Sequence, residues 1–284
     1  MKSLSDLLSY KEVYVDGMNL AARSFHGMKG LSYKGKPTGM LYGVVRLVLD
    51  YIGPNRKIVF LWEGRGSIRK QKDKDYKSKR IPLGDRDDGF LDSLATVKAI
   101  LPALGVDQVR CDGLEADDLA YYYASVGNHP ILLVSNDSDW LAFASGSPRV
   151  DVLSGSLLLT ERMVREKEGL SGLKLTELKI LKGDPSDNVS GIPRLPTKLA
   201  QRMVAESEGD FYTFLKSIGE HKWAKVLEDN QDVLVRNMLL TMPLPIQGEG
   251  LKVTHGARDK GIASQILKEH GMELFVSKVE VWKC

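Results

Sequence analysis

The sequence has little of what would cross-link a chain or embed it in a membrane. Only two of its 284 residues are cysteines, Cys111 and Cys284, far apart in sequence. So few thiols exclude a disulfide-stabilised scaffold and favour a reducing, cytoplasmic setting. The longest apolar stretches, residues 40–52 and 157–159, are too short or too interrupted by charge to span a bilayer, so we expect no membrane contact. The N-terminal segment MKSLSDLLSY lacks a sustained apolar core, so we do not expect it to be a signal peptide.

The net charge is also small, because 40 basic residues nearly balance 37 acidic ones. Hydrophobic residues make up 43% and charged residues 27%, which is typical of a soluble globular protein and excludes a disordered chain. The basic residues are unevenly placed. Residues 65–86 contain nine Lys or Arg and three Asp, a local charge of +6, which leaves −3 for the rest. This distribution indicates either a polyanion-binding segment beside an acidic site or a solvated charged linker.

The first half of the sequence alternates between strand and helix patterns. Buried or β-branched runs at 11–15, 57–62, 106–110 and 130–135 predict strands, and 150–153 with 156–160 predict a hairpin turned at Ser154-Gly155. Helical spacing marks 38–52, 88–104 and 115–126. This alternation predicts an α/β fold with a mostly parallel sheet flanked by helices.

The second half of the sequence is helical in pattern. Segments 175–181, 197–206, 211–218, 233–240 and 261–270 have helical spacing. Between the first two lies GDPSDNVSGIPRLP, which is rich in Gly, Pro and Asp and is therefore predicted to be loop and turn. A helical region following an α/β body is the expected organisation.

Acidic residues recur where the predicted strands and turns end. In an open α/β sheet the functional site lies outside the carboxyl ends of the strands. Carboxylates converging there would repel one another unless cations neutralised them, and oxygen ligands without His or Cys suit Mg²⁺ or Mn²⁺. We therefore expect a metal-binding cluster at this edge. The candidate ligands are Asp16, Glu63, Glu115, Asp117, Asp118, Asp137, Asp139, Asp184 and Asp187.

Each of these carboxylates also has a structural alternative. Glu115 and Asp117 would lie on nearly opposite sides of a regular helix, so they can serve one ion only where the chain enters the helix. Asp137 and Asp139 share a face while the chain is extended, but either could cap the following helix. Asp184, followed by proline, has the pattern of a helix N-cap.

Five segments, in this order, resemble the 5′-nuclease superfamily, which includes flap endonucleases, bacteriophage 5′–3′ exonucleases and the 5′-nuclease domain of bacterial DNA polymerase I. They are VDGMN (15–19), YKSKR (76–80), GLEADDLA (113–120), VSNDSDW (134–140) and GDPSDNVSGIP (183–193). The resemblance covers roughly residues 11–240, and the length resembles a stand-alone enzyme of the bacteriophage or small bacterial type. It implies a cytoplasmic location, in the host if the protein is bacteriophage-encoded.

The resemblance implies a PIN-like nuclease core (1–172), a helix–three-turn–helix DNA-binding region (173–240) and a C-terminal segment packing on the core (241–284). It implies a first metal site of Glu115, Asp117 and Asp137, completed by Asp16 and Glu63. Asp139, Asp184 and Asp187 would supply or approach a second site, and Asp118 belongs to the same motif as Asp117.

The basic segment would correspond to the arch that admits a single-stranded 5′ end; we call residues 64–90 the arch segment. Within it the resemblance places Tyr76, Lys77 and Arg80 against the scissile phosphate. Lys77 and Arg80 share a face if this stretch is helical. The remaining DNA contacts implied are Arg69, Lys70, Lys72, Lys198 and Gly191.

Two positions depart from the pattern. Glu63 stands where the family usually has Asp, so its side chain is one methylene longer and metal preference can differ. Arg194 and Pro196 stand where the family usually has glycines that approach a phosphate or a potassium ion. This weakens the expectation of K⁺ in the turn, whereas Lys198 remains as a phosphate contact.

The implied activity is a Mg²⁺-dependent flap endonuclease and 5′–3′ exonuclease of DNA replication and repair, acting as a monomer on DNA with a 5′ flap or 5′ end, or on an RNA–DNA hybrid. Two ions about 3.5–4 Å apart would hold the scissile phosphodiester. The five histidines lie outside the motifs and are interpreted as structural or surface residues.

Three alternatives remain open. A haloacid-dehalogenase-type phosphatase also ends its first strand in Asp, but it needs a second Asp where this chain has Met18. A non-catalytic nucleic-acid binder of the same fold would be expected to have lost several carboxylates. A PIN-type ribonuclease would lack the helix–three-turn–helix region.

Overall fold

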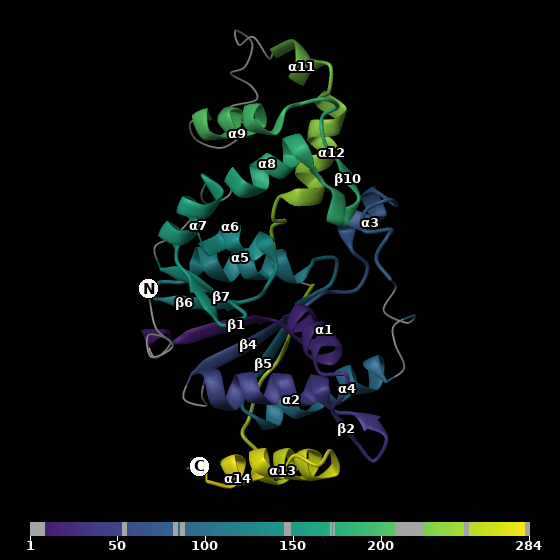
Figure 1. Ribbon diagram of the computed structural model, residues 1–284, viewed down its shortest axis with the longest axis vertical. Coiled ribbons are helices and arrows are strands. Elements are labelled where there is room, and N and C mark those ends of the chain that lie inside the picture. Colours follow the sequence, from purple (N-terminus) through teal and green to yellow (C-terminus); the bar gives the residue numbers. More distant parts are fainter. Residues whose placement is uncertain are drawn as a thin grey trace.

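A seven-stranded sheet forms the centre of the protein (Figure 1). The computed structural model describes residues 9–52, 56–81, 85, 89–144, 149–170, 172, 174–207, 224–246 and 250–281. The strand order is β11-β5-β4-β1-β6-β7-β8, with parallel pairing from β5 to β7 and antiparallel pairing of β11 and β8 at the two edges. The α/β prediction is confirmed, including the mostly parallel sheet. The described helices include none long and apolar enough to cross a membrane.

The predicted strands form close to where the sequence places them. The central strands are β1 (Glu12–Asp16), β4 (Lys57–Trp62), β5 (Asp107–Cys111), β6 (Ile131–Val134) and β7 (Val150–Ser154). β7 and β8 (Leu157–Leu159) form the predicted hairpin, although its turn is Gly155–Ser156, one residue later than expected. The other edge strand, β11 (Leu251–Thr254), comes from the C-terminal segment and pairs with β5.

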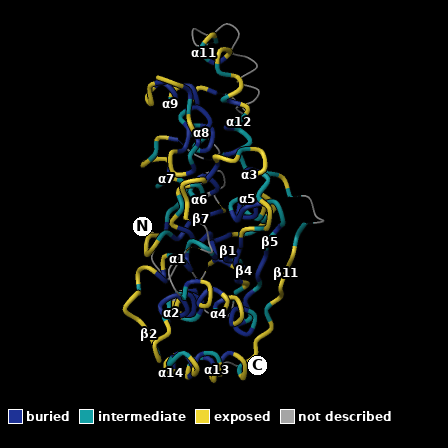
Figure 2. The backbone as a smooth tube through the Cα atoms, turned by 90° about the vertical axis from the view of Figure 1, so that its right-hand side faces the viewer, coloured by how far each residue is buried: buried dark blue, intermediate teal, exposed yellow. Residues whose placement is uncertain are grey.

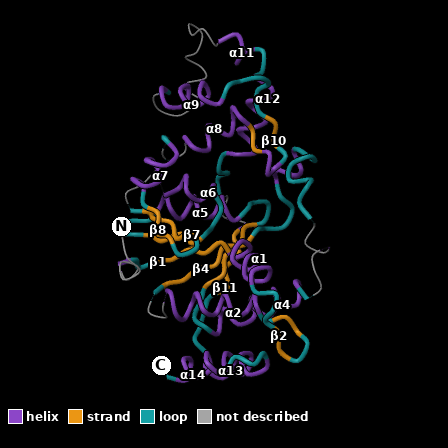
Figure 3. Tube along the Cα trace, in the orientation of Figure 1, coloured by secondary structure: helices purple, strands orange, loops and turns teal. Residues whose placement is uncertain are grey.

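Helices cover both faces of the sheet because successive residues of each strand point to opposite faces. In β1, Val13 and Val15 lie in the core under one set of helices, whereas Tyr14 lies in the core on the other face. The first set is α1 (Gly17–Gly27), α2 (Gly39–Arg46, continued by a π-helical stretch Leu47–Ile52) and α4 (Phe90–Ala103). The second set is α5 (Ala116–Val126) and α6 (Ser138–Ala144). Figure 3 shows the strands between these layers.

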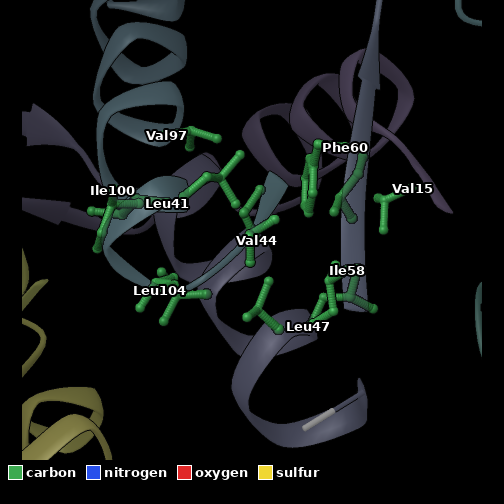
Figure 4. Close-up of a cluster of buried hydrophobic side chains, with 14 of the residues drawn as sticks. Val15, Leu41, Val44, Leu47, Ile58, Phe60, Val97, Ile100 and Leu104 are labelled. Atoms are coloured by element: carbon green, nitrogen blue, oxygen red, sulfur yellow. The ribbon is translucent and has the colours of Figure 1, made fainter. Parts of the chain in front are cut away.

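The core between the sheet and α2 and α4 is built from aliphatic side chains. Figure 4 shows Val44 of α2 between Ile100 of α4 and the strand β4, which carries Ile58 and Phe60, and Val44, Ile100 and Phe60 are fully buried. Burying each such side chain contributes about 1.5–3 kcal/mol to stability. α13 (Lys260–Glu269) packs on α4, and α14 (Glu273–Glu280) packs against α13; Leu267 and Phe275 of these helices extend the core.

The helical region lies beyond α5 and α6 and has a hydrophobic core of its own (Figure 2). It contains α7 (Glu161–Glu168), α8 (Lys174–Lys182), α9 (Thr197–Glu206), α11 (Ala224–Glu228) and α12 (Gln231–Thr241). The turn-rich segment forms a two-stranded ribbon, β9 (Gly183–Asp184) and β10 (Val189–Ser190), around a short 3-10 helix (Pro185–Asp187). The helix expected at 211–218 lies outside the described residues.

Asn237 of α12 connects this ribbon to the helices. Its buried amide donates to the backbone carbonyl oxygens of Ile180 (2.9 Å) and Ser190 (2.8 Å). α8 therefore leads directly into a ribbon whose geometry is held by α12. Two small elements complete the description: a hairpin of β2 (Ser32–Tyr33) and β3 (Lys36–Pro37), and α3 (Ile68–Lys72) in the arch segment.

Candidate metal site

A cavity of about 420 Å³ opens at the carboxyl ends of the central strands, between the sheet and the β9–β10 ribbon. Eight of the nine candidate carboxylates line it, and Asp118 does not. The lining carboxylates come from the ends of β1 and β4, the starts of α5 and α6, and the ribbon. They are Asp16, Glu63, Glu115, Asp117, Asp137, Asp139, Asp184 and Asp187.

Asp16 is the last residue of β1 and the N-cap of α1. It therefore has a structural role at the start of the helix and also lines the cavity as a candidate metal ligand. One carboxylate oxygen accepts from the backbone N–H of Asn19 (3.0 Å), and the other accepts from the Ser135 hydroxyl (2.8 Å). The side chain is buried, and burial raises the pKa of Asp16 to about 6, with the charges of Asp137 and Glu63 adding to the effect. Ser135, which follows β6, was not predicted from sequence.

Glu115 and Asp117 meet at the cavity because they lie where the chain enters α5, as expected. Glu115 is the N-cap and Asp117 the second helical residue. Asp117 Oδ1 accepts a hydrogen bond from the indole Nε1 of Trp140 (2.6 Å). Burial raises the pKa of Asp117 well above its usual range; Lys77 opposes this, and the neighbouring charges of Asp137 and Asp16 add to it.

The three residues of the arch segment predicted to face the phosphate contact carboxylates of the cavity; they are Tyr76, Lys77 and Arg80. Lys77 Nζ is 2.7 Å from Glu115 Oε2 and 3.7 Å from Asp187 Oδ2. The Tyr76 hydroxyl donates to Glu115 (3.0 Å), and Arg80 pairs with Asp187. Burial alone would raise the pKa of Glu115, but Lys77 and Arg69 outweigh it and hold this pKa below its usual value.

The stretch that carries Lys77 is a turn rather than a helix. Residues 74–79 form successive turns, and Lys77 has φ of +54°, in the left-handed region that a non-glycine residue rarely adopts. Its backbone N–H donates to the carbonyl oxygen of Asp187 (2.8 Å), which holds this conformation. Asn188 also donates to the carbonyl oxygen of Asp75 (3.0 Å). Lys77 and Arg80 were expected to share a face only if this stretch was helical, and that condition is not met; tertiary contacts bring both to the cavity instead.

Lys179 is a cavity residue that sequence reasoning missed. It lies on α8 and pairs with both Asp139 and Asp184, the latter at 2.7 Å. Burial would lower the pKa of Lys179, but Asp139 and Asp184 outweigh it and raise this pKa. Asp184 caps the 3-10 helix as its sequence pattern suggested, and it lines the cavity as well. The only sequence signal for Lys179 was its position five residues before Asp184.

Glu63 and Asp137 also line the cavity, but among the described residues neither is paired with a cationic side chain. Glu63 follows β4 and is exposed. Asp137 Oδ1 accepts from the backbone N–H of Asp139 (3.0 Å), which caps the start of α6. Within the described residues, no Lys, Arg or His nitrogen forms an ion pair with either side chain.

Two predicted site residues require correction. Asp118 is completely buried, and its two oxygens accept from Arg69 at 2.7 Å each. It also accepts from the backbone N–H groups of Glu115 (2.9 Å) and Leu244 (2.8 Å). Asp118 is therefore not placed to bind a metal ion. Arg69, only 3% exposed, also donates to the carbonyl oxygen of Met242, so it is not placed to contact DNA.

The other predicted DNA contacts are accessible or lie beside the ribbon. Lys70 and Lys72 of α3 and Lys198 of α9 are exposed. Gly191 packs its backbone against Lys182, where an added Cβ would lie 2.1 Å from the carbonyl carbon. Arg194 has φ of +61°, so it adopts the left-handed conformation that glycine would adopt without strain.

The cavity residues fit a hard divalent cation by their chemistry, since every acidic donor is a carboxylate oxygen. Among the described residues that line the cavity, eight carboxylates face three lysine and arginine side chains, Lys77, Arg80 and Lys179. In the described ranges, however, no three acidic, His or Cys side chains yet lie close enough together to hold one ion. Oxygens of Glu115, Asp139, Asp184 and Asp187 bind those cationic side chains instead.

Comparison with known proteins identifies the family of the chain. Residues 11–169 match the family described as 5′-3′ exonuclease, N-terminal resolvase-like domain. DNA polymerase I of Mycobacterium tuberculosis is 30% identical over 247 residues, which cover 80% of this chain and 26% of that protein. The chain thus spans about a quarter of the length of the DNA polymerase I relatives that it matches.

A second relative is similar in length. The 5′-3′ exonuclease of Streptomyces coelicolor is 26% identical over 258 residues, covering 82% of this chain and 85% of that protein. Among solved structures, the flap endonuclease of bacteriophage T5, in a pseudo-enzyme-product complex with DNA and metal ions, superposes with a TM-score of 0.61. That match has 19% identity and covers 95% of this chain and 96% of that chain. With the family match extending over more than half of its length, the chain belongs to the 5′-3′ exonuclease family.

Proposed function

We propose that the protein is a structure-specific 5′-nuclease that hydrolyses phosphodiester bonds of DNA near junctions of single strand and duplex. One observation carries the proposal. Eight carboxylates from strand ends, helix starts and the ribbon line the same cavity as Lys77 and Arg80 of the arch segment. A phosphodiester in this cavity would meet acidic metal ligands on one side and positive side chains on the other. Cleavage of DNA 5′ flaps and 5′ ends in replication and repair is the corresponding activity.

Divalent metal ions, Mg²⁺ or Mn²⁺, belong to the proposal. Asp16, Glu115, Asp117 and Asp137 would hold a first ion, and Asp139, Asp184 and Asp187 would supply or approach a second. Glu63 would complete the first site. When bound, such ions activate water and stabilise the leaving oxygen of the phosphodiester. K⁺ in the turn near Arg194 has weaker support, because that position carries a side chain where close approach needs glycine.

The chain's own residues would position the phosphate. Lys77 and Arg80 line the cavity next to Glu115 and Asp187. Their positive charges would therefore lie beside a phosphate bound in the cavity. A preorganised positive charge stabilises a transition state more than a mobile one, because no reorganisation is needed as negative charge develops. Tyr76 is buried and holds Glu115, so it acts on the carboxylate rather than on DNA.

Duplex DNA would be held by the helical region. Lys198 is the second residue of α9, where exposed backbone N–H groups and a lysine together suit a phosphate. Lys70 and Lys72 would meet the single-stranded arm as it enters the arch segment. We propose, accordingly, a nuclease core of residues 1–172, a DNA-binding region of 173–240 and a C-terminal segment of 241–284, acting as a monomer in the cytoplasm.

The decisive experiment is product mapping. The protein is incubated with Mg²⁺ and, separately, with a 5′-labelled flap, a nicked duplex and an RNA–DNA hybrid. We expect cleavage near the single-strand/duplex junction that stops when EDTA is added. Binding of the flap without cleavage by any divalent metal would support the non-catalytic alternative. Release of inorganic phosphate from a phosphomonoester, with the flap left intact, would support the phosphatase alternative.

Lys198 tests the DNA-binding part separately from the chemistry. Lys198→Ala should weaken binding of duplex-containing substrates and lower the slope of log K against log salt by about one unit. Single-turnover cleavage at saturating enzyme should stay near normal. Lys268→Ala, an exposed lysine on α13 far from the helical region, is the matched control (Figure 1). Equal effects of the two substitutions would count against a specific contact at Lys198.

A further inference from the structure

Trp140 forms a hydrogen bond with a carboxylate of the cavity, a contact that packing alone does not explain. It is the third residue of α6, one position after Asp139, and it is completely buried. Its indole Nε1 donates to Asp117 Oδ1 at 2.6 Å, whereas the ring lies in the apolar core on the α5 and α6 side of the sheet. A buried tryptophan usually finds some partner for its N–H, and here that partner is a carboxylate that lines the cavity.

The surroundings of Asp117 make this neutral donor important. Three other carboxylates, Asp16, Asp137 and Asp139, line the same cavity as Asp117, and so does Lys77. Lys77 Nζ forms its close ion pair with Glu115, at 2.7 Å. Among the described residues, Trp140 is therefore the side chain that forms a hydrogen bond with Asp117. A hydrogen bond of this kind fixes the orientation of the carboxylate without filling the cavity with a cation.

We infer that Trp140 is a positioning residue that holds Asp117 Oδ1 against the core and leaves Oδ2 for a divalent cation in the cavity. This inference rests on the proposed metal-dependent function. α6 would then serve the site in two ways, since Asp139 lines the cavity and the next residue orients a carboxylate from α5. Outer partners of metal ligands act in this way in general, and their loss typically lowers metal affinity or activity by roughly 10- to 100-fold.

The test is Trp140→Phe, which keeps a buried aromatic ring and removes the N–H. Phe143→Leu is the matched control, because Phe143 is a buried aromatic on the same helix and in the same core. Mn²⁺ affinity of each protein is measured by titration calorimetry without DNA, and thermal unfolding is followed in parallel. We expect Trp140→Phe to weaken Mn²⁺ binding by roughly 10- to 100-fold. Phe143→Leu should lower the unfolding temperature and leave Mn²⁺ affinity within about threefold of wild type.

A spectroscopic measurement gives an independent readout. Binding of a cation at Asp117 changes the charge beside the Trp140 indole, so Mn²⁺ or Mg²⁺ should alter the tryptophan emission of the wild type. The same titration should lose that component in Trp140→Phe at saturating metal, and in Asp117→Asn. Unchanged Mn²⁺ affinity in Trp140→Phe, or an emission change as large as that of wild type, would overturn the inference.

Failure of the inference and failure of the proposed function give different results. If wild type cleaves a flap with Mg²⁺ and Trp140→Phe has the same metal dependence, the inference is wrong and the function stands. If wild type binds Mn²⁺ with the expected sensitivity to Trp140 but cleaves no DNA, the function is wrong and the positioning role stands.

Discussion

The two halves of the cavity hold the same kind of side chain in different electrostatic surroundings. In the half formed by β1, β6 and α5, Asp16, Asp117 and Asp137 form no ion pair among the described residues, and the pKa values of Asp16 and Asp117 are raised, chiefly by burial. We call these three the unpaired carboxylates.

In the half formed by the arch segment, α8 and the ribbon, cationic side chains bind the carboxylates. Lys77 and Arg80 bind Glu115 and Asp187, and Lys179 binds Asp139 and Asp184. Burial alone would raise the pKa of Asp184, but Lys179 and hydrogen bonds from Ser186 together outweigh it and lower this pKa. The pKa of Asp139 stays raised, because its burial outweighs Lys179. We call these four the paired carboxylates.

A bound metal ion would gain most from the unpaired carboxylates, because no cationic side chain in the described part of the chain already neutralises them. Asp16 is buried and forms no ion pair with any described residue, so its ionised form costs the metal-free protein free energy, whereas Lys77, Arg80 and Lys179 neutralise the paired carboxylates. The two halves should respond to substitution with opposite signs in metal-free stability, while both are needed for cleavage.

The largest effect is expected from Asp16→Asn in the unpaired half. Asparagine keeps an oxygen that can accept from Asn19 N–H, but it removes a ligand charge, so cleavage should fall by more than about 100-fold. Metal-free stability should rise. The pKa shift from 3.8 to about 6 corresponds to on the order of 3 kcal/mol that ionised Asp16 costs at neutral pH. Urea unfolding in EDTA, together with single-turnover cleavage, measures both effects; a loss of metal-free stability would contradict the comparison.

The same carboxylate sets a pH dependence whose sign follows from its raised pKa. The native state holds a proton on Asp16 between pH of about 6 and 3.8, where the unfolded chain has released it. Asp16 therefore destabilises the metal-free protein above about pH 6, and this cost disappears as the pH falls through that window. The difference in unfolding free energy between Asp16→Asn and wild type should shrink from pH 7 to pH 4; a constant difference would exclude Asp16 as its source.

Lys77→Met in the paired half should have the next largest effect. It removes the cation beside Glu115 from a buried pair, so metal-free stability should fall by on the order of 3 kcal/mol. Cleavage at saturation should slow by one or more orders of magnitude, with binding measured in Ca²⁺ nearly normal. Lys72→Ala, an exposed lysine of the same segment, is the control. Indistinguishable single-turnover rates for the two variants would reduce Lys77 to one member of a collectively acting basic segment.

Lys179→Met should mainly change stability, and it should do so in a metal-dependent way. Without Lys179, Asp139 and Asp184 lose their shared partner, so the metal-free protein should lose about 1–3 kcal/mol. Mg²⁺ should stabilise this variant more than it stabilises wild type, because the ion replaces the missing charge. Thermal unfolding with and without Mg²⁺ measures the difference. Equal stabilisation of both proteins would show that the ion and Lys179 act at separate places.

Glu63→Asp should have the smallest effect. Glu63 is exposed and lies at the rim of the unpaired half, so shortening it should shift the Mg²⁺ or Mn²⁺ concentration needed for cleavage by a few-fold without abolishing activity. Glu63→Gln, which removes the charge, should be worse. If both variants follow the wild-type metal titration, Glu63 is only a residue at the end of β4.

Much of the fold could be predicted from the sequence because local patterns were strong there. β4 occupies the predicted range, Lys57–Trp62, since a run buried on both faces has nearly continuous apolar residues. α9 likewise matches its predicted range, Thr197–Glu206. β11 went unpredicted because it is a short edge strand with exposed residues, whose partner β5 lies about 140 residues earlier.

The sequence by itself determined which residue types would meet, because the carboxyl ends of parallel strands share one edge of a sheet. Only the tertiary structure decided which of these carboxylates line the cavity and which are buried in ion pairs. Asp117 and Asp118 are adjacent and chemically identical, yet one lines the cavity and the other is buried against Arg69. The reason is that neighbours in a helix differ by about 100° in direction, and the direction of Asp118 is taken by Arg69 of α3 and by the backbone of Leu244, which follows α12.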